Sequence, residues 1–175
     1  MAPAALFRHD EAMESLDTLL QNQVYHFLLI FARVGSALML MPGTGDVFVP
    51  GRIRLYIGLG MAAVMTPALS GYLPPVPASA AAFGLFIGVE VLIGIFTGTI
   101  ARILLLAMDT AGMVISLVTG FANAQLFNPT TATQGSLYGG FLSTTALVLI
   151  FVTNLHHLLI GGIFESYSLF APGRF

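Results

Sequence analysis

Residues 118–140 read VTGFANAQLFNPTTATQGSLYGG, and they form the one long polar, turn-rich passage in an otherwise apolar chain. Asn, Gln and Thr side chains crowd this stretch, Pro129 breaks it, and it carries no formal charge. Lipid cannot satisfy free backbone N–H and C=O groups, so such a loop at membrane depth is tolerated only where it is buried in protein or lines a water-filled path. The stretch therefore predicts helices arranged around an uncharged loop that lies in or beside a passage.

The composition places the chain among membrane proteins. Hydrophobic residues make up 57% of its 175 residues and charged residues only 8%, whereas about 25% of the residues in a soluble domain are charged. No charge occurs between Arg54 and Glu90, or between Asp109 and Glu165. Each of these gaps can hold a membrane span of about 20 residues.

Several classes of function lack the residues that they require. The chain has no cysteine for disulfides or thiolate metal sites, and its six positive residues, all arginine, form no basic patch for nucleic acid. His156 and His157 are adjacent, so in a helix they point about 100° apart, unlike the zinc-binding histidines that recur at i, i+4. We therefore expect no metal, no cofactor and no nucleic-acid partner.

Apolar segments separated by helix breakers predict an all-α, multi-helix integral membrane protein with kinked or re-entrant helical hairpins. The polar, mildly acidic residues 1–23 form an N-terminal segment that we expect to be a solvated tail or a short surface helix. Residues 24–175 form a single membrane domain. Within it we expect helices at residues 24–41, 55–72, 81–108 and 109–122, and one long helix at 137–163.

Four charged side chains fall inside the apolar segments, and they are functional candidates because a charge at membrane depth is costly. They are Arg33, Glu90, Arg102 and Asp109. We expect Arg33 to face protein or water. Glu90 and Arg102 are about 18 Å apart along one helix and cannot pair, and Asp109 follows Arg102 by roughly 10 Å. These three dispersed charges form no relay, which favours structural pairing with neighbouring subunits. Their use in a proton-coupled solute transporter stays open as the alternative.

Gly84, Gly88, Gly94 and Gly98 recur at small-xxx-small spacing in the segment 81–108. Small residues at this spacing let the backbones of two helices approach closely. We therefore expect these glycines to be helix-packing positions and to provide close contacts between subunits.

A protease is a further alternative, because Gly43-Thr44-Gly45-Asp46 matches the Gly-x-Gly-Asp pattern of intramembrane aspartyl proteases. Such an enzyme needs a second aspartate so that the pair can share a proton and activate water. Asp109 is the other candidate at membrane level. However, Asp46 follows a Pro-Gly helix stop and lies in a loop, which favours an ordinary turn.

Phe121 and Phe127 lie within the uncharged loop. Apolar constrictions can close a path by dewetting, so their position favours a hydrophobic plug, with ordinary packing of the two rings as the alternative. A plug held by uncharged hydrogen bonds can open without releasing a buried charge.

Two long stretches and the tail carry an ordered set of motifs. FARVGSALMLMPGTGDVFVPGRIRLYIGLGMAAVMTPAL contains an arginine in its helix, a proline-ended loop, a VP-x-R-[IV]-[KR] motif and a later proline: Arg33, Pro42, Val49-Pro50, Arg52-Ile53-Arg54 and Pro67. GVEVLIGIFTGTIARILLLAMDTAGMVISLVTGFANAQLFNPTTATQGSLYGGFL contributes Glu90, Leu92-Ile93-Gly94, Ala111-Gly112, Gly120 and Asn128-Pro129. The tail adds Asn154, His156, His157, Glu165, Ser166 and Pro172.

In order and spacing, these motifs resemble the FliR/SctT family of flagellar and type III secretion export-gate proteins, in its N-terminal, FliP-like portion. The resemblance covers about residues 30–172. The family usually has Asp-Pro where this chain has Asn128-Pro129. It also continues into a FliQ-like helical hairpin, which we expect this chain to lack.

The resemblance implies a multi-pass protein of the bacterial inner membrane, at a flagellar basal body or a virulence secretion system, that forms part of a protein-conducting channel and its plug. It implies assembly with FliP-like and FliQ-like subunits and with FlhB/SctU-like and FlhA/SctV-like export proteins, and passage of exported polypeptides. It implies no enzyme activity and no cofactor. The plug candidates that it carries over are Gly120, Phe121, Ala122, Phe127, Asn128 and Pro129.

Overall fold

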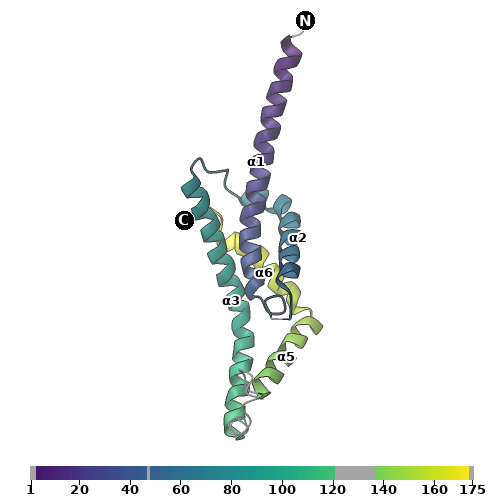
Figure 1. The fold of residues 1–175 in the computed structure, drawn as a ribbon, viewed down its shortest axis with the longest axis vertical. Coiled ribbons are helices and arrows are strands. Elements are labelled where there is room, and N and C mark those ends of the chain that lie inside the picture. The colour runs from purple at the N-terminus through teal and green to yellow at the C-terminus, as the bar shows by residue number, and fades with distance from the viewer. Residues whose placement is uncertain (1–2, 47, 121–136, 174–175) are drawn as a thin grey trace.

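The computed structural model describes residues 3–46, 48–120 and 137–173, and their side chains from residue 18 onward. These ranges contain helices and loops but no strand. The elements are α1 (Pro3–Leu40), α2 (Gly51–Leu69), the short 3-10 helix η1 (Ser70–Tyr72), α3 (Ala80–Val118), α5 (Leu137–Val152) and α6 (Leu155–Leu169) (Figure 1). The all-α class expected from the sequence is confirmed.

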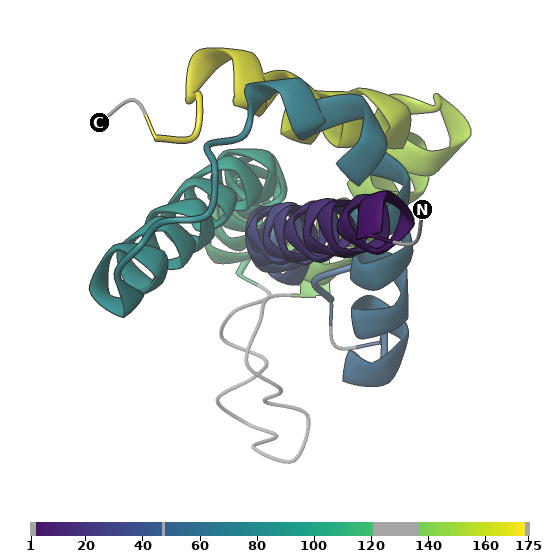
Figure 2. The same ribbon diagram turned by 90° about the horizontal axis from the view of Figure 1, so that it is seen from above.

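α1 is the central element of the bundle. Figure 2 shows it nearly end-on, between α3 on one side and α2 on the other. Its apolar residues Ile30, Val34, Ala37 and Leu38 recur at helical spacing and are buried on one face. They form a core with residues of α2 and α6: Ala62, Met65, Leu69, Ile163 and Tyr167. The core thus joins the first two helices to the last one.

The N-terminal half of α1 differs from the expected tail or short surface helix. α1 runs unbroken from Pro3 to Leu40, and its first half projects beyond the other helices (Figure 1). No glycine or proline occurs between residues 4 and 34, so no strong helix breaker is available to end the helix at residue 23.

The loop between α1 and α2 is a fixed turn. The Gly43 amide donates to the Asp46 carboxylate at 3.0 Å, and the Thr44 hydroxyl donates to the Leu38 carbonyl at 2.9 Å. Arg54 donates to the Asp46 carbonyl through Nη2 at 2.6 Å and to the Val49 carbonyl through Nε at 3.1 Å. These bonds hold the start of α2 against the end of α1.

α3 is one helix of 39 residues, capped at its start by Ser79, whose hydroxyl accepts a hydrogen bond from the Ala82 amide at 3.2 Å. The expected division into helices at 81–108 and 109–122 is wrong, because α3 passes through Asp109 and ends at Val118. A single glycine costs a helix about 1 kcal/mol relative to alanine, so Gly112 does not suffice to break it.

The expected single helix at 137–163 is also wrong. α5 and α6 form a pair bent by 78°. The bend lies at Asn154, whose φ of 59° is left-handed. Asparagine is one of the few residues that adopt this conformation readily. A bent helical pair of this kind agrees with the kinked or re-entrant hairpins expected in general terms.

Three helical segments of the described chain are long and apolar enough to cross a membrane: Thr18–Leu40, Gly51–Tyr72 and Ala80–Val118. The bent pair α5–α6 adds a fourth if it counts as one span. At 1.5 Å per residue α3 is about 58 Å long, well beyond the roughly 30 Å of a bilayer's hydrocarbon core.

Glycines set how closely α3 approaches its neighbours. A Cβ on Gly94 would collide with the Ser36 hydroxyl and the Arg33 carbonyl of α1, and one on Gly98 would lie 2.6 Å from the Ala37 carbonyl oxygen. The helix that approaches these two glycines is therefore α1 of the same chain.

The other glycines of α3 divide into two kinds. A Cβ on Gly84 or Gly88 would have no atom within 4 Å. Gly112, by contrast, lies directly against the backbone of Gly139 in α5, and a Cβ would not fit there. α3 thus packs backbone-to-backbone on α1 in its first half and on α5 near its end.

Gly94→Val should lower the stability of the protein, because the added carbons have to displace a backbone carbonyl rather than a flexible side chain. Overpacking of this kind costs about 1–3 kcal/mol. Thermal unfolding of the detergent-solubilised protein measures the effect. Gly88→Val is the matched control, since it places the same residue in the same helix but in open space. Equal losses in the two variants would show that helix propensity, and not the contact with α1, explains the effect.

Candidate functional site

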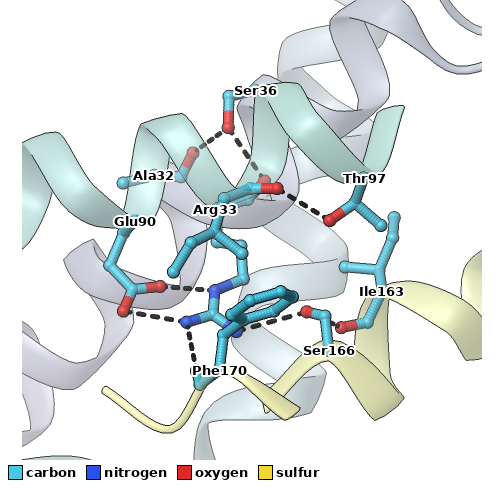
Figure 3. A network of polar contacts seen from close by, with 9 residues as sticks. Ala32, Arg33, Ser36, Glu90, Thr97, Ile163, Ser166 and Phe170 are labelled. Carbon is cyan, nitrogen blue, oxygen red and sulfur yellow. Dashed lines mark hydrogen bonds and ion pairs between the residues drawn. The ribbon is translucent and has the colours of Figure 1, made fainter. Parts of the chain in front are cut away.

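Arg33 of α1 and Glu90 of α3 form a bidentate ion pair in the middle of the bundle (Figure 3). Arg33 Nε donates to Glu90 Oε2 at 2.5 Å, and Nη2 donates to Oε1 at 3.0 Å. The two side chains are 0% and 2% exposed. Bidentate arginine–carboxylate pairs are among the strongest and most directional polar contacts in proteins, so this pair fixes how α1 and α3 face each other.

The same guanidinium also holds the end of α6. Its Nη1 donates to the Ser166 hydroxyl at 3.2 Å, and its Nη2 donates to the Phe170 carbonyl at 2.9 Å (Figure 3). Its Cζ lies 3.9 Å from the centre of the Tyr167 ring, within the range of a cation–π contact. Three helices therefore converge on one buried arginine.

Local geometry explains why Arg33 and Glu90 meet. Gly94 follows Glu90 by one helical turn and lies against the Arg33 carbonyl, so it brings the two helix backbones close enough for the side chains to pair. The Ser36 hydroxyl bonds back to the Ala32 and Arg33 carbonyls at 2.7 and 3.0 Å. On α6, the Ser166 hydroxyl also donates to the Ile163 carbonyl at 2.6 Å.

The arrangement has the properties of a structural clamp. The two charges neutralise each other, and four of the five N–H donors of Arg33 have named acceptors. Among the described residues, no three His, Asp or Glu side chains gather as a set that could hold a metal ion. The buried cluster, defined here as the side chains of Arg33, Glu90, Ser166 and Tyr167 with the backbone carbonyl of Phe170, can therefore position helices.

Arg102 and Asp109 do not join this cluster. Both lie further along α3 and are partly buried, and neither has an ion-pair or hydrogen-bond partner among the described residues. The structure therefore separates the four charged candidates into a bonded pair and two unpaired charges.

The plug candidates fall mostly outside the described residues. Gly120 is described: it follows α3 and has a φ of 78°, which favours glycine. Phe121, Ala122, Phe127, Asn128 and Pro129 lie outside the described residues. The described chain resumes at α5, close to the contact between Gly112 and Gly139.

The residues behind the other sequence hypotheses have local roles. The Asp46 carboxylate accepts the Gly43 amide within its own turn. The centroid of the His156 ring lies 4.1 Å from that of His157 and 5.1 Å from that of Phe151, with the planes tilted, so these rings form an aromatic group at the bend between α5 and α6.

Sequence reasoning missed the pairing of Arg33 with Glu90 and the part played by Ser166, Tyr167 and Phe170. One signal was available for the pair, since Arg33 and Glu90 are opposite charges in separate apolar segments, and charges at membrane depth pair with one another. The contacts of α6 gave no such signal, because a hydroxyl, a ring and a backbone carbonyl are common at any helix end.

Residues 24–175 match the protein family described as "Bacterial export proteins, family 1". The match covers almost all of the described helices and every member of the buried cluster.

Curated relatives come from flagellar and secretion systems. The flagellar biosynthetic protein FliR of Caulobacter vibrioides is 40% identical over 148 residues, which are 85% of this chain and 59% of the relative. That of Bacillus subtilis is 31% identical over 142 residues, 81% of this chain and 54% of the relative. The Yop proteins translocation protein T of Yersinia pestis is 27% identical over 150 residues, 85% and 57%. The chain thus spans between half and three fifths of these relatives' length.

Glu90→Gln should destabilise the protein strongly, because it leaves the Arg33 charge buried without a counter-ion. Breaking a buried pair in this way costs about 3–5 kcal/mol. Unfolding in detergent by heat or denaturant measures the loss. The double variant Arg33→Met/Glu90→Met removes both charges and should lose less than Glu90→Gln alone. The pairing would be contradicted if the stability loss of the double variant equalled the sum of the losses of Arg33→Met and Glu90→Met measured separately.

The absence of cysteine provides a direct test of the contact with α6. Ser166→Cys introduces a thiol at a buried position, which should react slowly with a maleimide. Adding Glu90→Gln should make it react faster, since Arg33 loses the partner that orients it toward α6. Unchanged labelling would show that α6 docks independently of the ion pair.

Proposed function

The chain belongs to family 1 of the bacterial export proteins, and on that premise we propose that it forms part of the wall of a protein-conducting path in a flagellar or type III secretion export apparatus. It is a multi-pass protein of the bacterial inner membrane. Residues 24–175 act as one membrane domain, to which residues 1–23 add a polar extension. No catalytic step is part of this function.

The family match over residues 24–175 is the observation that carries the proposal. The relatives named FliR and Yop proteins translocation protein T are components of flagellar biosynthesis and of protein translocation by name. A structural role also agrees with the buried cluster, which fixes three helices through one neutral, internally bonded group.

Residues 118–140 are proposed as the segment that closes the path. Support comes from its two ends, because Gly120 leaves α3 with a left-handed φ and Gly139 packs against Gly112 of the same helix. The segment is thus anchored to α3 on both sides. It carries no charge and includes Phe121 and Phe127, so an apolar constriction that excludes water and ions is the closure that its composition favours.

The two rival functions find less support in the geometry. A proton-coupled transporter would use Glu90 and Asp109, and Glu90 is bonded through both oxygens to Arg33. An aspartyl protease would use Asp46, which is engaged in the turn that ends α1. Glu90 and Asp46 are therefore occupied by structural contacts, whereas Asp109 has no bonding partner among the described residues.

Assembly tests the function directly. The tagged chain, expressed together with the FliP-like and FliQ-like subunits of the same bacterium, should be recovered from detergent in a stable complex with them. A chain that purifies alone under these conditions would overturn the proposed function.

The plug has its own test. In membranes that contain the assembled complex, Phe121→Ala/Phe127→Ala should increase ion leakage, because two apolar side chains are removed from the proposed constriction. A potential-sensitive dye measures the leak. Phe48→Ala is the control, since Phe48 lies in the loop before α2 and is 92% exposed. A tight membrane with the double variant would remove the plug from the proposal while leaving the assembly intact.

A further inference from the structure

Arg102 and Asp109 are two opposite charges on α3, and neither has a bonding partner among the described residues. They are seven residues apart, so they lie on one face of the helix and roughly 10 Å apart along its axis. Both are partly buried, and neither bonds to another described residue. The buried cluster around Arg33 does not use them.

The surroundings of this couple suit neither water nor lipid. The same turns of α3 expose large apolar side chains, with Ile103 at 55%, Leu106 at 51% and Met113 at 47%. Water does not favour such a surface, and a bilayer does not favour a cation and an anion without partners. A protein neighbour that is apolar and carries complementary charges satisfies both conditions.

The part of the chain that the structure describes does not supply that neighbour. On the same stripe of α3, Gly98 packs on α1 and Gly112 packs on α5, and the two charges lie between these contacts. Residues 121–136 contain no charged residue. The acidic residues that precede residue 18 belong to the projecting end of α1, which lies at the opposite end of the molecule from the last turns of α3 (Figure 1).

The α3 helix of a second copy of the chain does not supply it either. Copies inserted in one membrane share one orientation, so two α3 helices facing each other across a twofold axis would place Arg102 beside Arg102 and Asp109 beside Asp109. Like charges at close range repel. A twofold contact between two α3 helices is therefore excluded, and a different chain is the partner that suits both charges.

We propose that Arg102 and Asp109 dock a helix of another subunit, which carries an acidic residue level with Arg102 and a basic residue level with Asp109. The matching residues are about two helical turns apart, with the acid first in a helix that runs parallel to α3 and the base first in an antiparallel one. The inference rests on the proposed function, because the docked helix is expected in a subunit of the same export apparatus. It adds that this helix carries one acidic and one basic residue about two turns apart.

The test exchanges the two charges and keeps everything else. Arg102→Asp/Asp109→Arg preserves net charge and composition but reverses the order of the signs. In co-expression with the other membrane subunits of the export apparatus, this variant should recover on the order of tenfold less complex than the wild type, since each charge then faces its own sign. Arg102→Lys keeps the sign and should stay close to the wild type. Arg52→Gln, in an exposed position at the start of α2, controls for loss of any arginine.

Folding is checked separately, because Ser166→Cys reports on the buried cluster in each background and should stay slow to label. Recovery restored by reversing the two matching charges of one neighbouring subunit would identify the docking helix and support the inference. A charge-exchanged variant that assembles as well as the wild type would overturn the inference and leave the proposed function standing. A wild-type chain that recovers no partner would overturn the proposed function, and the inference with it.

Discussion

The bidentate pair between Arg33 and Glu90 is the contact on which the arrangement of the helices depends. An ion pair buried in a low-dielectric interior adds little net stability compared with apolar residues of the same size, yet it is costly to break. Its effect is therefore selective: packings of α1 and α3 that separate the two charges are strongly disfavoured. Because the same guanidinium bonds Ser166 and Phe170, the selection extends to α6.

Glycine contacts allow α3 to approach α1 closely enough for this ion pair to form, and a further glycine contact joins α3 to α5. The Gly94 backbone lies against the Arg33 carbonyl, and Gly112 lies against Gly139 of α5. α3 is an unbroken helix between these points, so the position of its first half on α1 also determines where its last turns meet α5. The segment of residues 118–140 begins at the end of α3, and near its other end Gly139 contacts Gly112. Glu90 and Gly120 thus lie on, or directly after, the same unbroken helix.

The sequence predicted the helical class and the membrane environment, because composition and periodicity report directly on burial in an apolar medium. It failed where a single residue outweighed the pattern. The left-handed φ of Asn154 bends an apolar stretch that the sequence predicts to be one helix. The hydropathy pattern does not report backbone conformation, so the bend was not predicted. The division expected between residues 108 and 109 does not occur, because α3 is unbroken there and its Gly112 serves a close backbone contact. The ion pair between Arg33 and Glu90 could not be predicted in this way, because its two residues are 57 positions apart. Periodicity within one segment does not show which other segment it contacts.

Charges within the apolar segments thus serve two different purposes in this chain. Arg33 and Glu90 satisfy each other inside the fold, so the isolated chain can bury them at no cost in unpaired charge. Arg102 and Asp109 have no such partner among the described residues, and a membrane protein exposes such groups at a cost that only a neighbour can offset. The first couple determines how the chain folds. Under the docking proposal, the second is completed by a neighbouring subunit, which is the property expected of a chain that functions within an assembly.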